Sequence, residues 1–253
     1  MMKCCIVTTW YLIPRACRFA SATDPPFLCP RQCIGKRRLE SLTPQGLLHG
    51  SLRLGEIDPD LHRVYQTHGP PPMWGRPQTY ATLVRIILEQ QVSLAAAKGT
   101  FQRLGNRLSQ KITPTGVLSI GLEELRQLGF SRQKARYAID LAERITAGAF
   151  SLTKLRRLDD CEARGEMMSL LGFGPWSADI YLLMALKRPD VLPLGDLGLV
   201  KGVQEATGRT FAGPDAIARY AERWRPWRSV ATRMIWQAYL VNRGQDPSRI
   251  AAG

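Results

Sequence analysis

A glycine turn and one carboxylate stand out as groups that could act together on a polyanion. The turn Gly172–Gly174 follows an apolar helical run, and Pro175 then opens a new helix at the position where a missing N–H costs nothing. Free backbone N–H groups at such a turn can approach a phosphate oxygen closely. About twenty residues later, Asp196 precedes another apolar run, which predicts that it caps a helix N-terminus. Taken singly, an ordinary helix–helix turn and an ordinary N-cap are the simpler interpretations.

The turn and the acid belong to a set of motifs with a fixed order. These are Ile87–Ser93 (ILEQQVS), Leu128–Ala135 (LGFSRQKA), Leu170–Ala178 (LLGFGPWSA) with Pro193–Leu199 (PLGDLGL), and Trp224–Ala231 (WRPWRSVA). Together they resemble the helix-hairpin-helix, glycine/proline-loop, aspartate (HhH-GPD) superfamily of DNA glycosylases, in its 3-methyladenine DNA glycosylase II, or alkylpurine, branch. The resemblance covers roughly residues 56 to 243. It implies an all-α fold of two helical lobes with the active-site cleft between them, and a role at the start of base excision repair.

The chemistry that this resemblance implies requires one carboxylate, and Asp196 is the candidate. Cleaving an N-glycosidic bond develops positive charge on the sugar, so a carboxylate stabilises the transition state and can orient the attacking water. Ordinary glycosidases need a second carboxyl group to protonate the leaving group. An alkylated purine is already cationic and leaves easily. A single acid therefore fits alkylated purines flipped out of duplex DNA better than intact bases.

Two absences narrow the enzyme class. Lyase members of the superfamily carry a lysine two residues after the second hairpin glycine, where it forms a Schiff base with the sugar. That position is Trp176 here. The iron–sulfur members end in four cysteines, and no cysteine follows Cys161. We therefore expect a monofunctional glycosylase that leaves an abasic site, with no iron–sulfur cluster and no organic cofactor.

The resemblance also assigns the residues that would contact DNA. A corner between two helices would enter the minor groove, where Gln91 fills the gap left by the flipped base. The complete set of expected DNA-binding residues is Gln90, Gln91, Gly172, Phe173, Gly174 and Ser177. A monovalent cation, Na⁺ or K⁺, would bridge the hairpin to phosphate through the main-chain carbonyl groups of Met168, Leu170 and Phe173.

Recognition of the base is expected to be aromatic, because an electron-poor alkylpurine stacks well on an indole face. Trp227 matches the pocket tryptophan of the alkylpurine branch, and Trp176 and Tyr181 are nearby candidates. Core packing is the competing interpretation for all three. Two residues depart from the family pattern. Ile180 replaces a residue that is often aromatic, which leaves the range of accepted bases open, and Leu171 replaces the hairpin proline.

The apolar pattern predicts a succession of helices that would position these groups. Apolar residues recur at three- and four-residue spacing along most of the chain after Gly55, and we find no period-two strand pattern between residues 56 and 243. Helix starts are predicted at Asp58–Asp60, Ser93, Ser131, Asp159 or Asp160, Gly213 and Pro226. We expect an irregular or poorly ordered extension over residues 1–55 and one glycosylase domain of two lobes over residues 56–253.

The first fifty residues differ in composition from the rest. They hold five of the six cysteines, Cys4, Cys5, Cys17, Cys29 and Cys33. Since no pair has C-x-x-C spacing, unligated thiols are favoured over a zinc site. The segment does not fit a signal peptide, and its first 23 residues carry no acid, a weak sign of an organellar presequence. We favour a segment that lies upstream of the native translation start.

Charge indicates the kind of partner. The chain has 35 basic and 21 acidic residues, a formal net charge of +14, and no apolar run long enough to span a membrane. This excess suits double-stranded DNA and fast, salt-sensitive association, although a basic protein without such a partner would have the same balance. We expect a monomer that binds duplex DNA containing damaged bases, without a membrane, in the cytoplasm with the nucleoid or in a eukaryotic nucleus.

Two other functions remain open on the sequence. A non-catalytic helix-hairpin-helix protein would explain the charge and the glycine turn equally well, but it does not explain Asp196, nor Trp227 and Gln91 together. The second is a glycosylase for deaminated, oxidised or mispaired bases, and Trp176 argues only against its lyase members.

Overall fold

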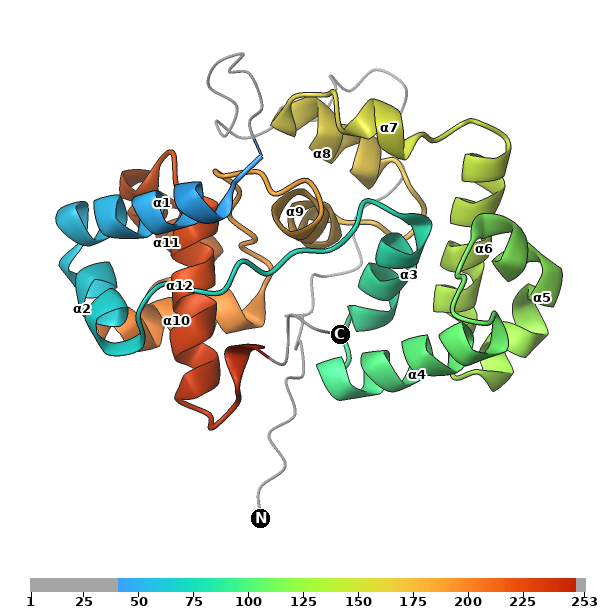
Figure 1. Cartoon of the computed structure of the whole chain (residues 1–253), viewed down its shortest axis with the longest axis horizontal. Coiled ribbons are helices and arrows are strands. Elements are labelled where there is room, and N and C mark those ends of the chain that lie inside the picture. The colour runs from blue at the N-terminus through green and yellow to red at the C-terminus, as the bar shows by residue number, and fades with distance from the viewer. Residues whose placement is uncertain (1–40, 249–253) are drawn as a thin grey trace.

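The two ends of the described chain meet in one helical lobe, and its middle forms the other (Figure 1). The computed structural model describes residues 41–248. The first lobe comprises α1 (Pro44–Ile57), α2 (Pro59–His68), α10 (Leu197–Thr207), α11 (Pro214–Ala221), the 3₁₀ helix η1 (Glu222–Trp224) and α12 (Arg228–Val241). The second comprises α3 (Tyr80–Glu89), α4 (Leu94–Arg107), α5 (Pro114–Gln127), α6 (Arg132–Thr146), α7 (Leu152–Leu155), α8 (Asp160–Met168) and α9 (Pro175–Met184). Residues 41–248 contain no strand, so the all-α prediction is confirmed.

Each lobe has its own apolar cluster. One is built mainly on α3, α6 and α9, and the other on α1, α2, α10 and α12. Two segments, residues 69–79 and 185–196, carry the chain from one lobe to the other. None of the helices within residues 41–248 has the length and apolar character needed to cross a bilayer.

Side-chain caps begin most of the helices where the sequence predicts them. Asp58 caps α2, Ser93 caps α4 and Ser131 caps α6, each accepting a hydrogen bond from a backbone N–H of the first turn. Of the two candidates before α8, Asp159 is the cap, in a reciprocal capping box with Glu162. The last helix, α12, begins at Arg228, two residues after the predicted start.

The predicted boundary of the N-terminal extension is wrong, because residues 44–55 form most of α1. Thr43 caps this helix, and Leu47 and Leu54 are buried against the first lobe. The helix carries three glycines, which weakens its apolar period in the sequence. One of them has a packing role, since a Cβ at Gly50 would lie 3.0 Å from the Trp227 ring. The five N-terminal cysteines lie outside the described residues.

A buried arginine fastens the two lobes together. Arg233 on α12 is fully buried and donates hydrogen bonds to the carbonyl groups of Ser229, Trp74 and Leu183, at 3.2, 3.1 and 2.9 Å. Trp74 lies on the crossing segment, and Leu183 lies on α9. Burial lowers the pKa of Arg233 to about 10. These bonds fix α12 against the second lobe.

We predict that Asp58→Ala destabilises the fold by about 2–4 kcal/mol, because it removes a cap and leaves the buried indole N–H of Trp224 without a partner, whereas the Tyr220 hydroxyl keeps its hydrogen bond to Asp60 at 2.9 Å. Asp58 is fully buried and accepts from Trp224 Nε1 at 2.7 Å and from the Tyr220 hydroxyl at 3.2 Å. Urea denaturation measures the loss, with Glu56→Ala on the exposed end of α1 as the matched control. Equal stability of the two variants would contradict the prediction.

Candidate active site

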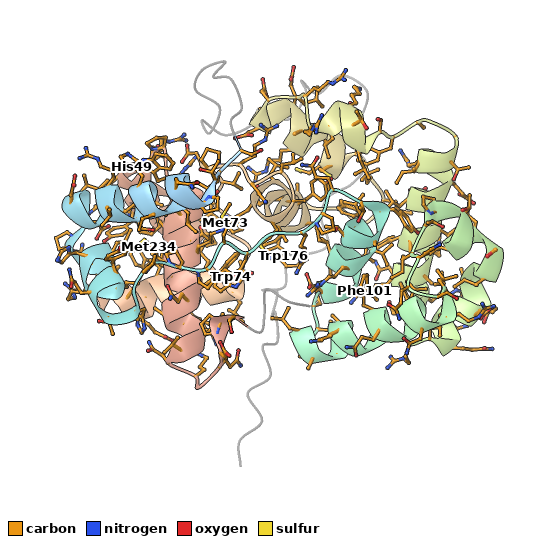
Figure 2. The ribbon with its side chains drawn as sticks, viewed as in Figure 1. His49, Met73, Trp74, Phe101, Trp176 and Met234 are labelled. Atoms are coloured by element: carbon orange, nitrogen blue, oxygen red, sulfur yellow. The ribbon has the colours of Figure 1, made fainter. Side chains whose placement is uncertain are left out.

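A cavity of about 310 Å³ lies between the lobes. Its walls include Trp74, Trp176, Ile180, Asp196, Trp236 and Tyr239. Trp74 and Trp176 both lie near the middle of the molecule, on the crossing segment and at the start of α9 (Figure 2). The volume falls in the range of small-molecule sites, roughly 300–1,000 Å³. The indoles that surround the Asp196 carboxylate make this cavity the candidate active site.

The carboxylate of Asp196 is held from three directions. It caps α10, as predicted, where Oδ1 accepts from the Leu199 N–H at 2.8 Å. Oδ1 also accepts from Trp236 Nε1 at 2.9 Å, and Oδ2 accepts from Trp176 Nε1 at 3.2 Å. Three N–H donors therefore fix the orientation of a half-buried acid at the cavity wall.

Three indoles surround the cavity, and only Trp176 was among the predicted pocket residues. Trp74 and Trp236 lie with ring centroids 6.2 Å apart and tilted planes. A hydrogen bond holds the Trp74 ring in place, because its Nε1 donates to the Pro247 carbonyl at 2.9 Å. Neither Trp74 nor Trp236 was predicted from the sequence to line the pocket. Trp236 lies beyond the last matched motif, where the one available signal is its helical spacing to Tyr239 and Leu240, which also line the cavity.

The prediction that Trp227 lines the base pocket is wrong, because its side chain lies elsewhere in the first lobe. Its ring packs against α1, edge-on to His49 at a centroid distance of 5.9 Å, and it does not line the cavity. Trp227 occupies the N-cap position of α12 without a side-chain cap, whereas Trp236 follows nine residues later, about two and a half helical turns along. The tryptophan that faces the cavity is therefore Trp236.

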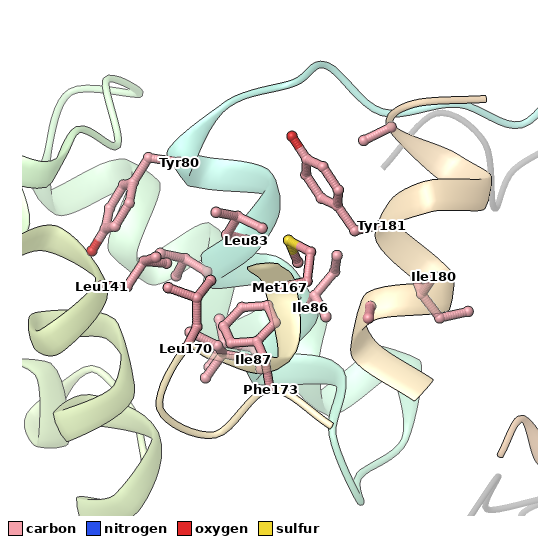
Figure 3. Close-up of a cluster of buried hydrophobic side chains, with 14 of the residues drawn as sticks. Tyr80, Leu83, Ile86, Ile87, Leu141, Met167, Leu170, Phe173, Ile180 and Tyr181 are labelled. Atoms are coloured by element: carbon pink, nitrogen blue, oxygen red, sulfur yellow. The ribbon is translucent and has the colours of Figure 1, made fainter. Parts of the chain in front are cut away.

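Tyr181 is also a core residue and not a pocket residue. Its ring is fully buried in the apolar cluster between α3, the hairpin and α9 (Figure 3), and burial raises the pKa of its hydroxyl group. Figure 3 shows the neighbouring Ile180 pointing away from that cluster. The reason is helical spacing, because Trp176, Ile180 and Met184 lie four residues apart and share the face that lines the cavity.

The hairpin between α8 and α9 uses its two glycines differently. Gly172 has a left-handed φ of +82°, and a Cβ there would lie 2.1 Å from the Tyr137 ring. Gly174 has an ordinary φ, and open space surrounds its missing Cβ. Gly174 precedes Pro175 without any side-chain cap, so the N-terminus of α9 is available to an anion.

Two predicted DNA-binding residues instead connect the hairpin to the corner between α3 and α4. Gln90 Nε2 donates to the Gly172 carbonyl at 2.8 Å and to Ser177 Oγ at 3.0 Å. Ser177 is only 2% exposed, so its hydroxyl supports Gln90 and cannot reach a phosphate. Phe173 likewise places its ring in the core (Figure 3), which leaves only its backbone near the surface.

The corner itself presents Gln91. This residue is exposed and has a left-handed φ of 55°, a conformation that is costly for a side chain other than glycine or asparagine. Lys134 on α6 holds the corner in place, since its Nζ donates to the carbonyl groups of Leu88 and Gln90, both at 2.7 Å. Burial lowers the pKa of Lys134 to about 8, against the opposing effect of Glu89. The role of Gln91 as a wedge stays a prediction.

The cation site also stays a prediction. The Leu170 carbonyl accepts a hydrogen bond from the Phe173 N–H at 3.1 Å, which closes a turn between these two residues, and Met168 is the last residue of α8. Carbonyl oxygens suit a hard cation. Within residues 41–248, no group of three or more His, Cys, Asp or Glu side chains could hold a metal ion.

Comparisons with known proteins agree with this architecture. The model of the HhH-GPD superfamily base excision DNA repair proteins matches residues 84–228. DNA-3-methyladenine glycosylase 2 of Escherichia coli (strain K12) is 30% identical over 81% of this chain and 71% of its own length. The putative DNA-3-methyladenine glycosylase YfjP of Bacillus subtilis (strain 168) is 26% identical over 70% of this chain. The chain spans 65% of the length of that Bacillus protein.

A solved structure shows the same fold. The 3-methyladenine DNA glycosylase Mag1 of Schizosaccharomyces pombe, in complex with abasic DNA, superposes with a TM-score of 0.69 at 22% identity, over 75% of this chain and 95% of its own. The helices and the cavity define a two-lobed, all-helical protein with a hairpin between α8 and α9 and with Asp196 at the wall of its cleft. The chain belongs to the HhH-GPD superfamily of base excision DNA repair proteins.

We predict that Gly172→Ala destabilises the protein, whereas Gly174→Ala does not. The first change forces a left-handed backbone on alanine and places a methyl group in the Tyr137 ring, which together cost about 2–4 kcal/mol. The second meets open space. Thermal and urea unfolding of the two variants measure the difference. Similar stabilities of the two variants would contradict the close packing of the Tyr137 ring against Gly172.

Proposed function

We propose that this protein is a monofunctional DNA glycosylase that hydrolyses the N-glycosidic bond of alkylated purines in duplex DNA. The observation that carries the proposal is the position of Asp196, whose carboxylate lies at the wall of the aromatic cavity and is held by two indole N–H groups. Such a carboxylate can stabilise the positive charge that develops on the sugar. Release of the base would leave an abasic site and so start base excision repair.

Three indoles suit the leaving group that this reaction needs. An alkylated purine is electron-poor and cationic, and it gains from stacking on the π faces of Trp74, Trp176 and Trp236. The base must leave the helical stack to reach them. Gln91, exposed at its strained corner, is suited to fill the gap that remains in the duplex.

We propose that the protein has no lyase activity because of the residue at one position of the hairpin. Trp176 stands where a Schiff-base lysine would, and its indole N–H is engaged with Asp196. Lys98 lines the cavity from α4, at an exposed position on the rim. Strand breakage must therefore be measured together with base release.

Binding of the duplex would involve the free N-terminus of α9 and the net charge of +14. We propose that the protein acts as a monomer on DNA that contains damaged bases, with a monovalent cation at the hairpin carbonyl groups. Because this substrate is DNA, we propose that the protein lies where the DNA is, in the bacterial cytoplasm or in a eukaryotic nucleus.

Asp196→Asn is expected to reduce base release by at least about 100-fold and to leave DNA affinity unchanged, because the charge is lost while the size is kept. Single-turnover release of 3-methyladenine and 7-methylguanine from methylated duplex DNA measures the rate, and gel analysis detects nicked strands. Asp215→Asn, at an exposed position on α11, is the matched control. Release by the wild type with intact abasic strands supports the proposal. An unchanged rate in Asp196→Asn would remove this acid from the mechanism.

Trp236→Phe and Trp227→Phe distinguish the two tryptophans near α12. The first removes one donor to Asp196 and should lower the single-turnover rate by about 10- to 100-fold, the range expected for a hydrogen bond to a charged group. The second retains an aromatic ring against α1 and should change the rate less than about threefold. A larger loss of rate in Trp227→Phe would indicate that Trp227 belongs to the base pocket.

A further inference from the structure

A second charged cluster lies in the wall of the cavity, apart from Asp196. Arg76 binds both carboxylate oxygens of Glu89, at 2.8 and 2.7 Å, and Arg85 Nε binds Glu89 Oε1 at 3.1 Å. All three residues line the cavity, and none is well exposed, with 12%, 6% and 17% of the side-chain surface of Arg76, Glu89 and Arg85 accessible. The mechanism proposed above does not use this cluster.

Glu89 is not suited to be a second catalytic acid. Both of its oxygens already accept hydrogen bonds from guanidinium groups, so its carboxylate is committed to holding the two arginines. Its physical effect is to orient Arg85. Burial and the nearby Arg76 lower the pKa of Arg85, and Glu89 opposes this shift.

Arg85 has donors that remain for a ligand. Within residues 41–248, neither of its two terminal nitrogens makes a hydrogen bond, and its guanidinium carbon lies 6.0 Å from the centroid of the Phe101 ring. A planar guanidinium with two unused N–H edges is suited to bind adjacent acceptor atoms at the edge of a base.

The charge balance of the cavity indicates which bases benefit. Arg76, Arg85 and Lys98 carry positive charge against Glu89 and Asp196, which leaves one excess positive charge. A cationic alkylpurine gains nothing from that excess. A neutral purine gains twice, because its carbonyl oxygen or unprotonated ring nitrogen accepts a hydrogen bond, and because the base itself becomes negatively charged as it leaves.

We propose that Arg85, oriented by Glu89, is a specificity-determining residue that donates hydrogen bonds to a neutral damaged purine and stabilises it as it leaves. This inference rests on the proposed glycosylase function and extends it beyond cationic bases. When the C1′–N bond breaks, its electron pair stays on the base nitrogen, next to the guanidinium. Water then supplies a hydroxyl group to C1′ and, overall, a proton to the released base.

The test compares two lesions in otherwise identical duplexes, one with a single 7-methylguanine, which is cationic, and one with a single hypoxanthine, which is neutral and has a carbonyl acceptor. Arg85→Gln should lower single-turnover release of hypoxanthine by roughly 5- to 150-fold, the contribution of one bidentate arginine–base contact, and change release of 7-methylguanine by less than about threefold. Arg85→Lys keeps the charge without the planar fork and should give an intermediate ratio.

Two further variants separate recognition from folding. Glu89 keeps its bidentate partner Arg76 in Arg85→Gln, so no buried carboxylate is left alone. Arg219→Gln, on the exposed face of α11, makes the same charge change far from the cavity and should leave both rates unchanged. The single variant Glu89→Gln should lower the rate of hypoxanthine release relative to that of 7-methylguanine release. In the double variant with Arg85→Gln, it should lower this ratio no further than Arg85→Gln alone.

The outcomes distinguish this inference from the proposed function. Release of 7-methylguanine but not hypoxanthine by the wild type, or an equal loss of both rates in Arg85→Gln, would overturn the role of Arg85 and leave the glycosylase intact. Release of neither base would remove the proposed function and this inference with it. A selective loss of hypoxanthine release, with unchanged thermal stability, supports it.

Discussion

The arrangement of this protein depends on one carboxylate that both lobes hold. Trp236 comes from α12 in the first lobe and Trp176 from α9 in the second, and their indole N–H groups bind different oxygens of Asp196. The position of the acid is therefore coupled to the relative position of the lobes. Arg233, one helical turn before Trp236, fixes the same helix to α9 and to the crossing segment. A small shift between the lobes would misplace the acid, and such misplacement is costly for catalysis.

A second coupling joins the two surfaces expected to meet DNA. Gln90 binds both the turn carbonyl of Gly172 and the hydroxyl of Ser177, so the corner that presents Gln91 cannot move independently of the hairpin. Lys134 adds two hydrogen bonds to the same corner. This rigidity maintains the unfavourable φ of Gln91, because strain of this kind persists only where the surrounding contacts determine the backbone. Phosphate binding at the hairpin and insertion at the corner would then be a single event.

The sequence predicted the features that local physics decides. Caps such as Ser131 and Asp196 and the glycine turn follow from backbone hydrogen bonding within a few residues, and the structure confirms them. The side-chain directions were harder, because Tyr181 and Trp227 are aromatic residues in the right motifs but face the core and α1. Motif membership does not say which face of a helix points to the cavity. Helix α1 was missed for a related reason, since its Gly50 is explained only by the close packing of Trp227 and Val230.

The buried cluster around Glu89 is difficult to explain by stability. Removing two guanidinium groups and a carboxylate from water costs several kcal/mol per ion, and well-packed apolar residues of similar size would often stabilise a fold equally or better. Arg76 attaches the crossing segment to α3 through Glu89, but Arg85 and Glu89 belong to the same helix, so Arg85 adds no contact between the lobes. Its arginines instead border the cavity that holds Asp196. A charge arrangement that is expensive for folding and located where a base would bind is better explained by recognition, because an acceptor on the base would complete the hydrogen bonding that the protein leaves open.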